Sequence, residues 1–417
     1  MGAALLCAAV LGLATTGLAS ASVAPRAGAN VLPPALPLVG GPARPDQDAF
    51  YRPPADFADA DAGDLIRSRE SRVYPTPARL VPAPVRAWQV LYRSTSARDE
   101  PDAVSGTVLV PAVLWRGSGR RPIVTYTIGT HGLGDQCAPS YELASGTEQE
   151  FALMGQALAR GWAVAVTDYE GLGTPGEHTY TVARSEGRAA LDVVRAATQI
   201  DGADLSRDAP VGIWGYSQGG GAAASAAEQA KDYASELNVV GVAEGGVPSD
   251  LRAVARNLDG SAAFGLLAGA AAGFDAAYPD VGIRGFLNAK GRELIAKVRQ
   301  ECTAELGARH AGRRLAEFTT IADPLDFPPL VKVLRDNRIG AQAPDMPVRL
   351  YHAQLDELIP LGVANRLMRE YCGRGVRTQF QVIPAVEHVG GAVLGAPGSV
   401  SWLADRFAGR PAPDSCG

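Results

Sequence analysis

Short apolar runs of strand length alternate with longer helical runs through most of this sequence. The strand-like runs are 85–95, 103–112, 121–129, 162–171, 209–217, 239–248, 346–360 and 376–388. The helical patterns among them are 146–161, 184–199 and 219–237. Alternation at this spacing predicts an α/β fold with a mostly parallel central sheet and helices on both of its faces.

One predicted strand ends on a serine that has glycines on both sides. Ser217 follows Gly215-Tyr216 and precedes Gln218-Gly219, and an alanine-rich helical pattern begins directly behind it. A turn this sharp strains its central residue, and side chains two positions away would collide, so glycine is needed there. Between a strand and a helix, G-x-S-x-G indicates a nucleophilic serine, with a purely structural turn as the alternative.

A serine nucleophile needs a base to take its proton and an acid to orient that base. The histidines that follow Ser217 are His310, His352 and His388. His388 is predicted as the base because it comes just after the last predicted strand, where functional groups collect in such sheets. Asp356 follows the preceding strand and is predicted as the acid. It is favoured over Glu357 because a shorter side chain suits a fixed orienting role.

Two loops are expected beside the nucleophile. The backbone N–H of Gln218 should bind the oxyanion, and the second donor is predicted at His131 or Gly132, in the loop after the strand 121–129. Tyr169, in the loop after the next strand, is a candidate for the substrate pocket, although a structural role is an equal alternative. A dinucleotide-binding loop is excluded at residues 132–137, because the last glycine of G-x-G-x-x-G is Cys137.

The remaining segments suggest an exported protein with an inserted helical region. Residues 1–21 resemble a signal peptide with a small-residue cleavage site, although no Lys or Arg precedes the apolar run. An N-terminal membrane anchor is the alternative reading. Residues 22–60 are rich in Ala, Pro and Asp and predict an extended arm. The sheet domain is predicted at 61–248 and 346–417, and the mainly helical segment 249–345 is predicted to be a cap or lid.

Composition and motifs exclude several classes of function. The formal net charge is −5, with 39 basic and 44 acidic residues, and no Lys/Arg block suggests nucleic acid as a partner. Neither H-E-x-x-H nor a paired C-x-x-C is present, so no metal and no cofactor are predicted. Removal of the signal would leave Cys137, Cys302, Cys372 and Cys416, which allow two disulfides in three connectivities.

Several separated motifs resemble a known family. In chain order they are CAPSYEL, DYEGLG, LDVVRAA, GYSQGG, EGGVPSDL and LDELIP. They resemble the secretory lipases of the Candida type and their actinobacterial relatives, which have the α/β-hydrolase fold, over roughly residues 45 to 417. The resemblance implies a Ser217–Asp356–His388 triad, secretion, and a cap over the active site. It also implies the disulfides Cys137–Cys302 and Cys372–Cys416. The loop GTHGLGDQ departs from the acidic loop of the yeast lipases.

These observations together predict a secreted serine hydrolase of carboxylic esters, with triacylglycerol or another lipid as its substrate. Contact with a lipid interface is expected to be transient, and the sequence does not give the oligomeric state. Phe264, Leu266 and Leu267 in the cap are predicted to cover an acyl pocket. The alternatives are a carboxylesterase for short soluble esters, an acyltransferase of envelope lipids, and a serine peptidase, since the same triad serves each reaction.

Overall fold

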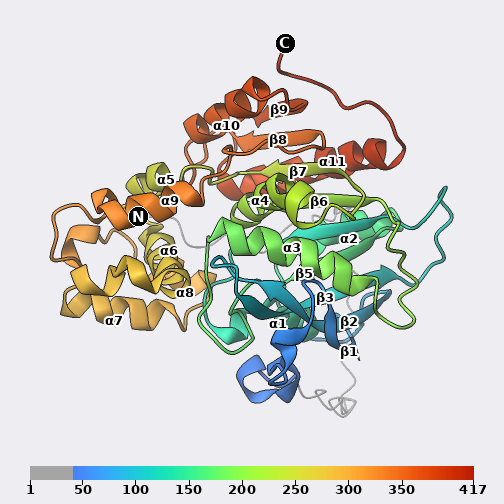
Figure 1. Cartoon of the computed structure of the whole chain (residues 1–417), viewed down its shortest axis with the longest axis horizontal. Coiled ribbons are helices and arrows are strands. Elements are labelled where there is room, and N and C mark those ends of the chain that lie inside the picture. The colour runs from blue at the N-terminus through green and yellow to red at the C-terminus, as the bar shows by residue number, and fades with distance from the viewer. Residues whose placement is uncertain (1–40) are drawn as a thin grey trace, which may run out of the picture. The chain divides into compact units, whose positions relative to one another are not determined.

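The computed structural model describes residues 41–417, so the predicted signal peptide 1–21 and the arm up to residue 40 lie outside the described residues. Within residues 41–417, nine strands form one sheet in the order β1-β2-β3-β5-β4-β6-β7-β8-β9 (Figure 1). The strands are β1 (Leu65–Ser71), β2 (Val85–Thr95), β3 (Pro101–Pro111), β4 (Ile123–Thr127), β5 (Ala163–Thr167), β6 (Val211–Tyr216), β7 (Val239–Gly245), β8 (Val348–Ala353) and β9 (Thr378–Ile383).

The α-helices of the described residues connect these strands. They are α1 (Pro139–Ser145), α2 (Phe151–Ala159), α3 (Ala183–Ala197), α4 (Gln218–Tyr233), α5 (Leu251–Leu258), α6 (Phe264–Ala277), α7 (Ala289–Val298), α8 (Thr303–Arg309), α9 (Pro328–Asp336), α10 (Leu361–Gly373) and α11 (His388–Phe407). The short 3-10 helices are η1 (Pro45–Gln47), η2 (Ala49–Tyr51), η3 (Phe57–Asp59), η4 (Asp135–Cys137), η5 (Pro279–Val281), η6 (Ile283–Phe286), η7 (Leu315–Glu317) and η8 (Pro324–Asp326).

The sheet is mostly parallel, as the strand–helix alternation predicts. β1, β2 and β3 pair antiparallel at one edge, β3 pairs antiparallel with β5, and the six strands from β5 to β9 run parallel. Every residue of β4, β5 and β6 is buried. Continuous burial requires helices on both faces of the sheet, because a strand with one wet face would alternate between apolar and polar residues.

Different helices cover the two faces of the sheet. α3, α4 and α10 pack on one face, and α2 and α11 pack on the other. The buried residues of α4 are mainly Ala and Gly, and such small side chains let the helix backbone lie close to β6 and β7. This close packing matters for the site, because α4 starts at the residue that follows Ser217.

The connection from β7 to β8 contains helices α5 to α9 and corresponds to the segment 249–345 predicted as a cap. Its apolar side chains form a cluster of their own, which includes Phe264, Leu306 and Phe318. Figure 1 shows α6, α7 and α8 grouped beside the sheet and not stacked on either of its faces. A chain that leaves the sheet for five helices and then returns provides a second surface that faces the carboxyl ends of the strands.

Four parts of the described chain differ from the sequence-based expectation, and one of them is helix α11, which no predicted helical pattern covers. The predicted extended arm includes residues 41–60, but η1, η2 and η3 lie there, and Phe50 and Tyr51 are buried. Strand β1 and helix α1 were not predicted at all. The Tyr51 hydroxyl of η2 lies 2.9 Å from the Ser140 hydroxyl of α1, so η2 and α1 are joined by a contact between residues far apart in sequence. Among residues 41–417, no helix is long and apolar enough to cross a membrane.

Candidate active site

Ser217 occupies a strained turn between β6 and α4. Its φ is +61°, a region that residues other than glycine rarely adopt, and its N–H donates to the Gly245 carbonyl at 3.0 Å. A Cβ atom on Gly219 would lie 2.0 Å from the Thr127 carbonyl oxygen, and one on Gly215 would lie 2.1 Å from the Thr127 hydroxyl. The glycines predicted around the serine are therefore required by the close approach of the turn to β4.

The three residues predicted as nucleophile, base and acid meet at the carboxyl ends of their strands. The His388 Nε2 atom lies 2.8 Å from Ser217 Oγ, and His388 Nδ1 lies 2.7 Å from Asp356 Oδ2. Ser217 follows β6, Asp356 follows β8, and His388 begins α11 after β9. Since β6, β8 and β9 run parallel, their carboxyl ends lie at one edge of the sheet, and the three side chains meet there although they are distant in sequence.

Asp356 is fixed on both of its oxygens. Its Oδ1 accepts hydrogen bonds from the backbone N–H groups of Leu358 at 3.0 Å and Ile359 at 2.8 Å, which leaves Oδ2 for the His388 ring. Burial raises the pKa of this carboxyl, but the hydrogen bond and charge of His388 lower it below the ordinary 3.8. Glu357, the alternative acid, instead accepts from the backbone N–H of His388 at 3.0 Å.

An apolar cavity opens beside Ser217. It has a volume of about 140 Å³ and lies between the sheet edge and the helices α5, α6, α7 and α9. The predicted pocket residues Phe264, Leu266 and Leu267 all line it, and so do Ser217 and Gln218. Its lining is almost wholly apolar, so it suits an apolar substituent.

Tyr169 does not line this cavity, so the predicted pocket role is wrong for this residue. Its side chain is buried, and its hydroxyl donates to the Ile128 carbonyl at 2.9 Å, just after β4. The residue adopts a φ of +70°, which residues other than glycine rarely do. Its short distance in sequence from β5 suggested proximity to the site, but it did not indicate the direction of the ring.

Gln218 is the first residue of α4, and the first N–H groups of a helix have no partner within that helix. Its backbone N–H is therefore available beside Ser217. Its side chain donates to Glu186 Oε1 of α3 at 2.7 Å. Burial raises the pKa of Glu186 to about 8, against the lowering effect of this hydrogen bond. Glu186 was not predicted, because nothing in the sequence joins α3 to the turn.

The loop after β4 places its residues differently from the sequence-based expectation. Thr130 lines the cavity with Ser217 and Gln218, whereas His131 and Gly132, the predicted donors, do not. The His131 side chain points into the protein, where Nε2 lies 2.9 Å from a Glu148 oxygen. Gly132 has a φ of +115°, and its Cβ would lie 2.4 Å from the Cys302 backbone. The glycine is therefore needed for contact with the cap segment.

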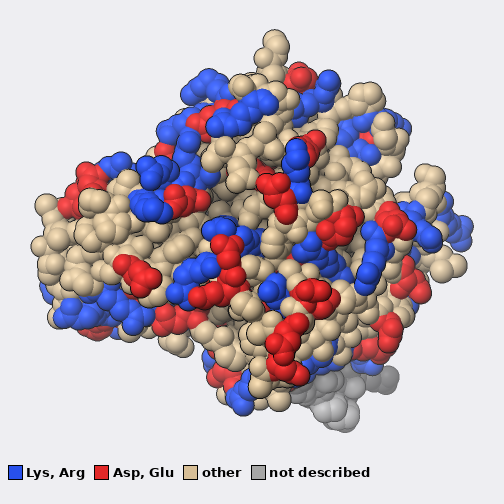
Figure 2. All heavy atoms as spheres, in the orientation of Figure 1, with Lys and Arg blue, Asp and Glu red and all other residues tan. Residues whose placement is uncertain are grey.

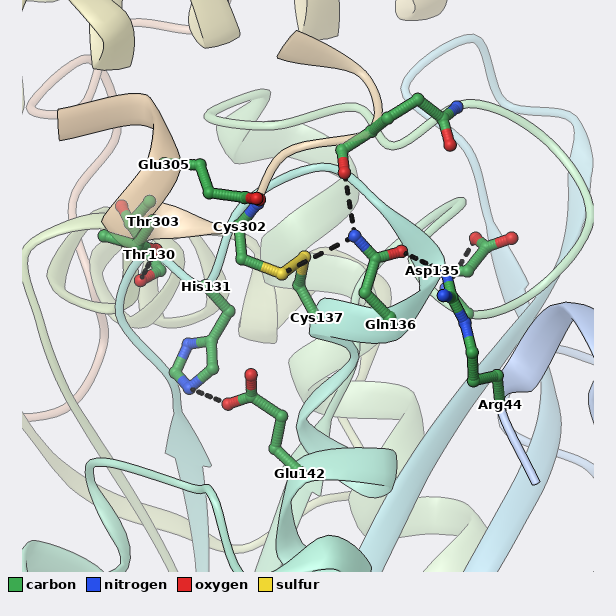
Figure 3. Close-up of a disulfide and its surroundings, with 12 residues drawn as sticks. Arg44, Thr130, His131, Asp135, Gln136, Cys137, Glu142, Cys302, Thr303 and Glu305 are labelled. Atoms are coloured by element: carbon green, nitrogen blue, oxygen red, sulfur yellow. Dashed lines mark hydrogen bonds and ion pairs between the residues drawn. A yellow bond between two sulfur atoms is a disulfide. The ribbon is translucent and has the colours of Figure 1, made fainter. Parts of the chain in front are cut away.

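Figure 3 shows this loop beside the start of α8, joined by a disulfide between Cys137 and Cys302. A second disulfide joins Cys372 to Cys416. Both are the pairs that the family resemblance implies. The Cys137–Cys302 bond attaches η4, directly after the loop, to the connection between β7 and β8. The disulfide therefore links the segment directly after the loop to the residue before α8, within the connection that also carries the cavity-lining helices.

One group of side chains in the described region has spacing that could suit a metal ion. The donor atoms of His131, Glu142 and Glu148 lie within 4.8 Å of one another and are largely buried. However, His131 Nε2 is already within 3.0 Å of both Glu148 oxygens. Direct contact of this kind suits the hydrogen-bonded ion pair of a protonated histidine with a carboxylate, which accounts for the close approach of His131 to Glu148.

On the face shown in Figure 2, acidic and basic side chains alternate without a large area of one sign. Several charged side chains of the described residues are paired across elements; Arg256 of α5, for example, lies 3.0 Å from Asp323. The charges on this face do not focus a field toward one region, so the character of the site comes from the apolar cavity and the hydrogen-bonded residues beside it.

Known lipases are similar to this chain over most of its length. A probable inactive lipase of Mycobacterium tuberculosis is 35% identical over 89% of this chain and 84% of its own. A secreted triacylglycerol lipase of Malassezia globosa is 29% identical over 89% of this chain and 81% of its own. The crystal structure of Candida antarctica lipase A superposes with a TM-score of 0.81 at 25% identity, covering 90% of this chain and 89% of that chain.

These similarities identify the fold as an α/β-hydrolase fold and support an ester hydrolase in general. A family model also matches residues 138–415, which include the turn at Ser217, the Asp356 loop and the start of α11. Because this match covers more than half of the sequence, the chain belongs to the secretory lipase family.

Proposed function

We propose that this protein is a secreted serine hydrolase of lipid esters, with Ser217, His388 and Asp356 as its catalytic triad. The observation that carries the proposal is the unbroken hydrogen-bond chain from Asp356 through His388 to Ser217, at 2.7 Å and 2.8 Å, beside an apolar cavity. Family membership alone does not carry it, since one relative is named a probable inactive lipase. The proposal rests on groups that this chain itself retains.

In the proposed reaction, Ser217 Oγ attacks the ester carbonyl while His388 Nε2 takes the hydroxyl proton. Asp356 keeps the proton of Nδ1 in place and stabilises the imidazolium that forms. Collapse of the tetrahedral intermediate releases the alcohol, which receives its proton from His388. The acyl group stays on Ser217 until water, activated by the same histidine, releases the acid.

The negative oxygen of the intermediate needs at least two N–H donors. We propose the Gln218 N–H as the first, as the sequence predicts, because it opens helix α4 and benefits from the helix dipole. For the second we propose the Thr130 N–H in place of His131 or Gly132. The support is that Thr130 lines the cavity with Ser217, and that no acceptor among residues 41–417 receives its N–H.

Helices α5 to α9 would then act as the cap predicted for residues 249–345, with the acyl chain in the cavity lined by Phe264, Leu266 and Leu267. An apolar lining favours a fatty acyl group over a peptide, since a peptide would bury unpaired amide groups there. Export is supported by the family description and by two disulfides, which persist in oxidising surroundings.

Ester cleavage by wild type and by Ser217→Ala tests this proposal. The substrates should be nitrophenyl esters from short to long acyl chains, together with an emulsified triglyceride. We expect wild-type turnover and a loss of at least about a thousandfold in kcat for Ser217→Ala, with an unchanged circular dichroism spectrum. Retained turnover in the variant would contradict the assignment. A strong preference for short soluble esters would identify a carboxylesterase, and ester products formed with an added alcohol would identify an acyltransferase.

A further inference from the structure

The loop Gly129–Gly132 is held from several sides, although it contains no regular secondary structure. The Gly129 N–H donates to Glu150 Oε1 at 3.0 Å, at the start of α2. The Thr130 carbonyl accepts from the Thr303 hydroxyl at 2.6 Å, and the Thr130 hydroxyl lies 2.8 Å from that of Tyr180. Every polar group of Thr130 except its N–H therefore has a partner within the described chain.

His131 fastens the same loop from inside the protein. Its Nδ1 lies 2.9 Å from the Gly129 carbonyl oxygen, which can only accept, so Nδ1 carries a hydrogen. Its Nε2 faces the two Glu148 oxygens at 3.0 Å and 2.9 Å and a Glu142 oxygen at 3.5 Å. An ionised Glu148 carboxylate can only accept, so opposite it both ring nitrogens donate and the ring is an imidazolium. Figure 3 shows the ring turned toward Glu142 and away from the cap.

The surroundings keep this charge in place. Burial alone would lower the pKa of His131, but the charge and hydrogen bond of Glu148, together with the charges of Glu142 and Glu150, raise it to about 10. The titratable groups that face the cluster are Glu142 on α1, Glu148 and Glu150 before α2, Asp168 after β5 and Tyr126 on β4. The side that faces the cap contributes Cys302, which is held in a disulfide, and Thr303, whose N–H donates to the His131 carbonyl at 2.9 Å.

We propose that His131 is a positioning residue: through its ion pair with Glu148 it fixes the Gly129–Thr130 backbone so that the Thr130 N–H points at the substrate's oxyanion. This inference rests on the proposed function, because it requires the reaction at Ser217. The ring does not touch the substrate, since it lies behind the loop and outside the cavity lining. Its contribution is preorganisation, because a donor that is held before the reaction costs no rearrangement in the transition state.

The test is His131→Leu, which removes both donors and keeps a buried side chain of similar size. Misplacement of one oxyanion donor should lower kcat roughly tenfold to a hundredfold, while KM stays within about twofold, because the donor acts mainly in the transition state. A boronic acid inhibitor, whose tetrahedral adduct would place an oxygen in the same position, should lose affinity by a similar factor. A general structural defect would not weaken this inhibitor selectively.

Three further variants sharpen the test. His131→Gln keeps amide donors and should recover part of kcat, even if His131→Leu folds poorly. Glu148→Gln should lower kcat as His131→Leu does. The double variant should have about the same kcat as the less active of the two single variants, because both changes break the same interaction. The matched control is His310→Leu, another buried histidine 2.7 Å from a glutamate, Glu301, which keeps Arg309 as a partner. It should leave kcat within about twofold of wild type.

The outcomes separate this inference from the proposed function. If wild type cleaves esters and Ser217→Ala does not, the function stands. An unchanged kcat and inhibitor affinity in His131→Leu would then overturn the positioning role alone. One equivalent of metal in wild type, measured by elemental analysis and lost in His131→Leu, would also overturn it, because a metal ion would then replace the imidazolium as partner of the carboxylates. Parallel losses in kcat and inhibitor affinity, without metal, support it.

Discussion

Replacement of Asp356 by asparagine should almost abolish ester cleavage without disturbing the fold. The two backbone N–H groups at Leu358 and Ile359 donate to Oδ1, so in the variant they will select the amide oxygen. The new NH2 group must then face His388 Nδ1 in place of Oδ2. Because NH2 only donates, the ring must accept at Nδ1 and carry its hydrogen on Nε2. In that tautomer Nε2 cannot accept the proton of Ser217.

The size of this effect follows from the burial of the pair. The Asp356 side chain is fully buried and that of His388 is 6% exposed, so solvent cannot rescue the ring orientation. A wrong tautomer in a serine hydrolase lowers kcat by about 10⁴, which corresponds to about 5 kcal/mol of transition-state stabilisation. KM for a soluble nitrophenyl ester should change little, since Asp356 is not expected to contact the substrate.

The assay is steady-state hydrolysis of one nitrophenyl ester by wild type, Asp356→Asn and Glu357→Gln, with denaturation curves for all three. The Glu357 side chain accepts from the backbone N–H of His388 and not from its ring, so its variant should keep kcat within about tenfold. If Asp356→Asn stays within tenfold of wild type, the tautomer argument is refuted. If Glu357→Gln instead shows the large loss, the acid has been assigned to the wrong neighbour.

Three other changes have defined outcomes. Gly219→Ala should destroy activity and much of the stability, because its Cβ would meet the Thr127 carbonyl oxygen at 2.0 Å; Gly155→Ala in α2, with no heavy atom within 4 Å, should be slightly stabilising by denaturation. Leu267→Trp should fill the cavity and lower kcat/KM for long-chain relative to short-chain nitrophenyl esters by about tenfold or more. The raised pKa of His131 contributes stability that is complete below about pH 6.5 and is lost toward pH 10, at up to about 1.4 kcal/mol per pH unit. Urea denaturation at a series of pH values in this range should therefore show that the free energy of unfolding falls less steeply with pH in His131→Leu than in wild type.

Prediction from the sequence worked where the signal was local. The central strands are continuous apolar runs, so β4, β5 and β6 were found at nearly their observed positions. The turn at Ser217 was found because it needs glycines within two residues on either side. The order Ser217, Asp356, His388 followed from the rule that functional groups gather after parallel strands. Each of these inferences needs only neighbouring residues or the order of the strands.

Prediction failed where the deciding contact joins distant parts of the chain. Thr130 is recognisable as a candidate donor only because Thr303, 173 residues away, and the cavity fix its position. The buried position of the Tyr169 side chain depends on the hydrogen bond from its hydroxyl to the Ile128 carbonyl, 41 residues earlier. Strand β1 has a polar, half-buried pattern, and its pairing with β2 supplies what its composition does not.

By itself, the sequence predicted an α/β architecture, a strained turn at Ser217, and Asp356 and His388 as the residues that meet this serine, because periodicity, glycine spacing and strand order can be read from the chain. The tertiary structure decided which loop residue lies beside Ser217, which side chains line the cavity, and why His131 is buried against Glu148. These features depend on the packing of the connection between β7 and β8 against the loop after β4. Such packing is set by long-range burial and hydrogen bonding, which leave no repeating pattern in the chain.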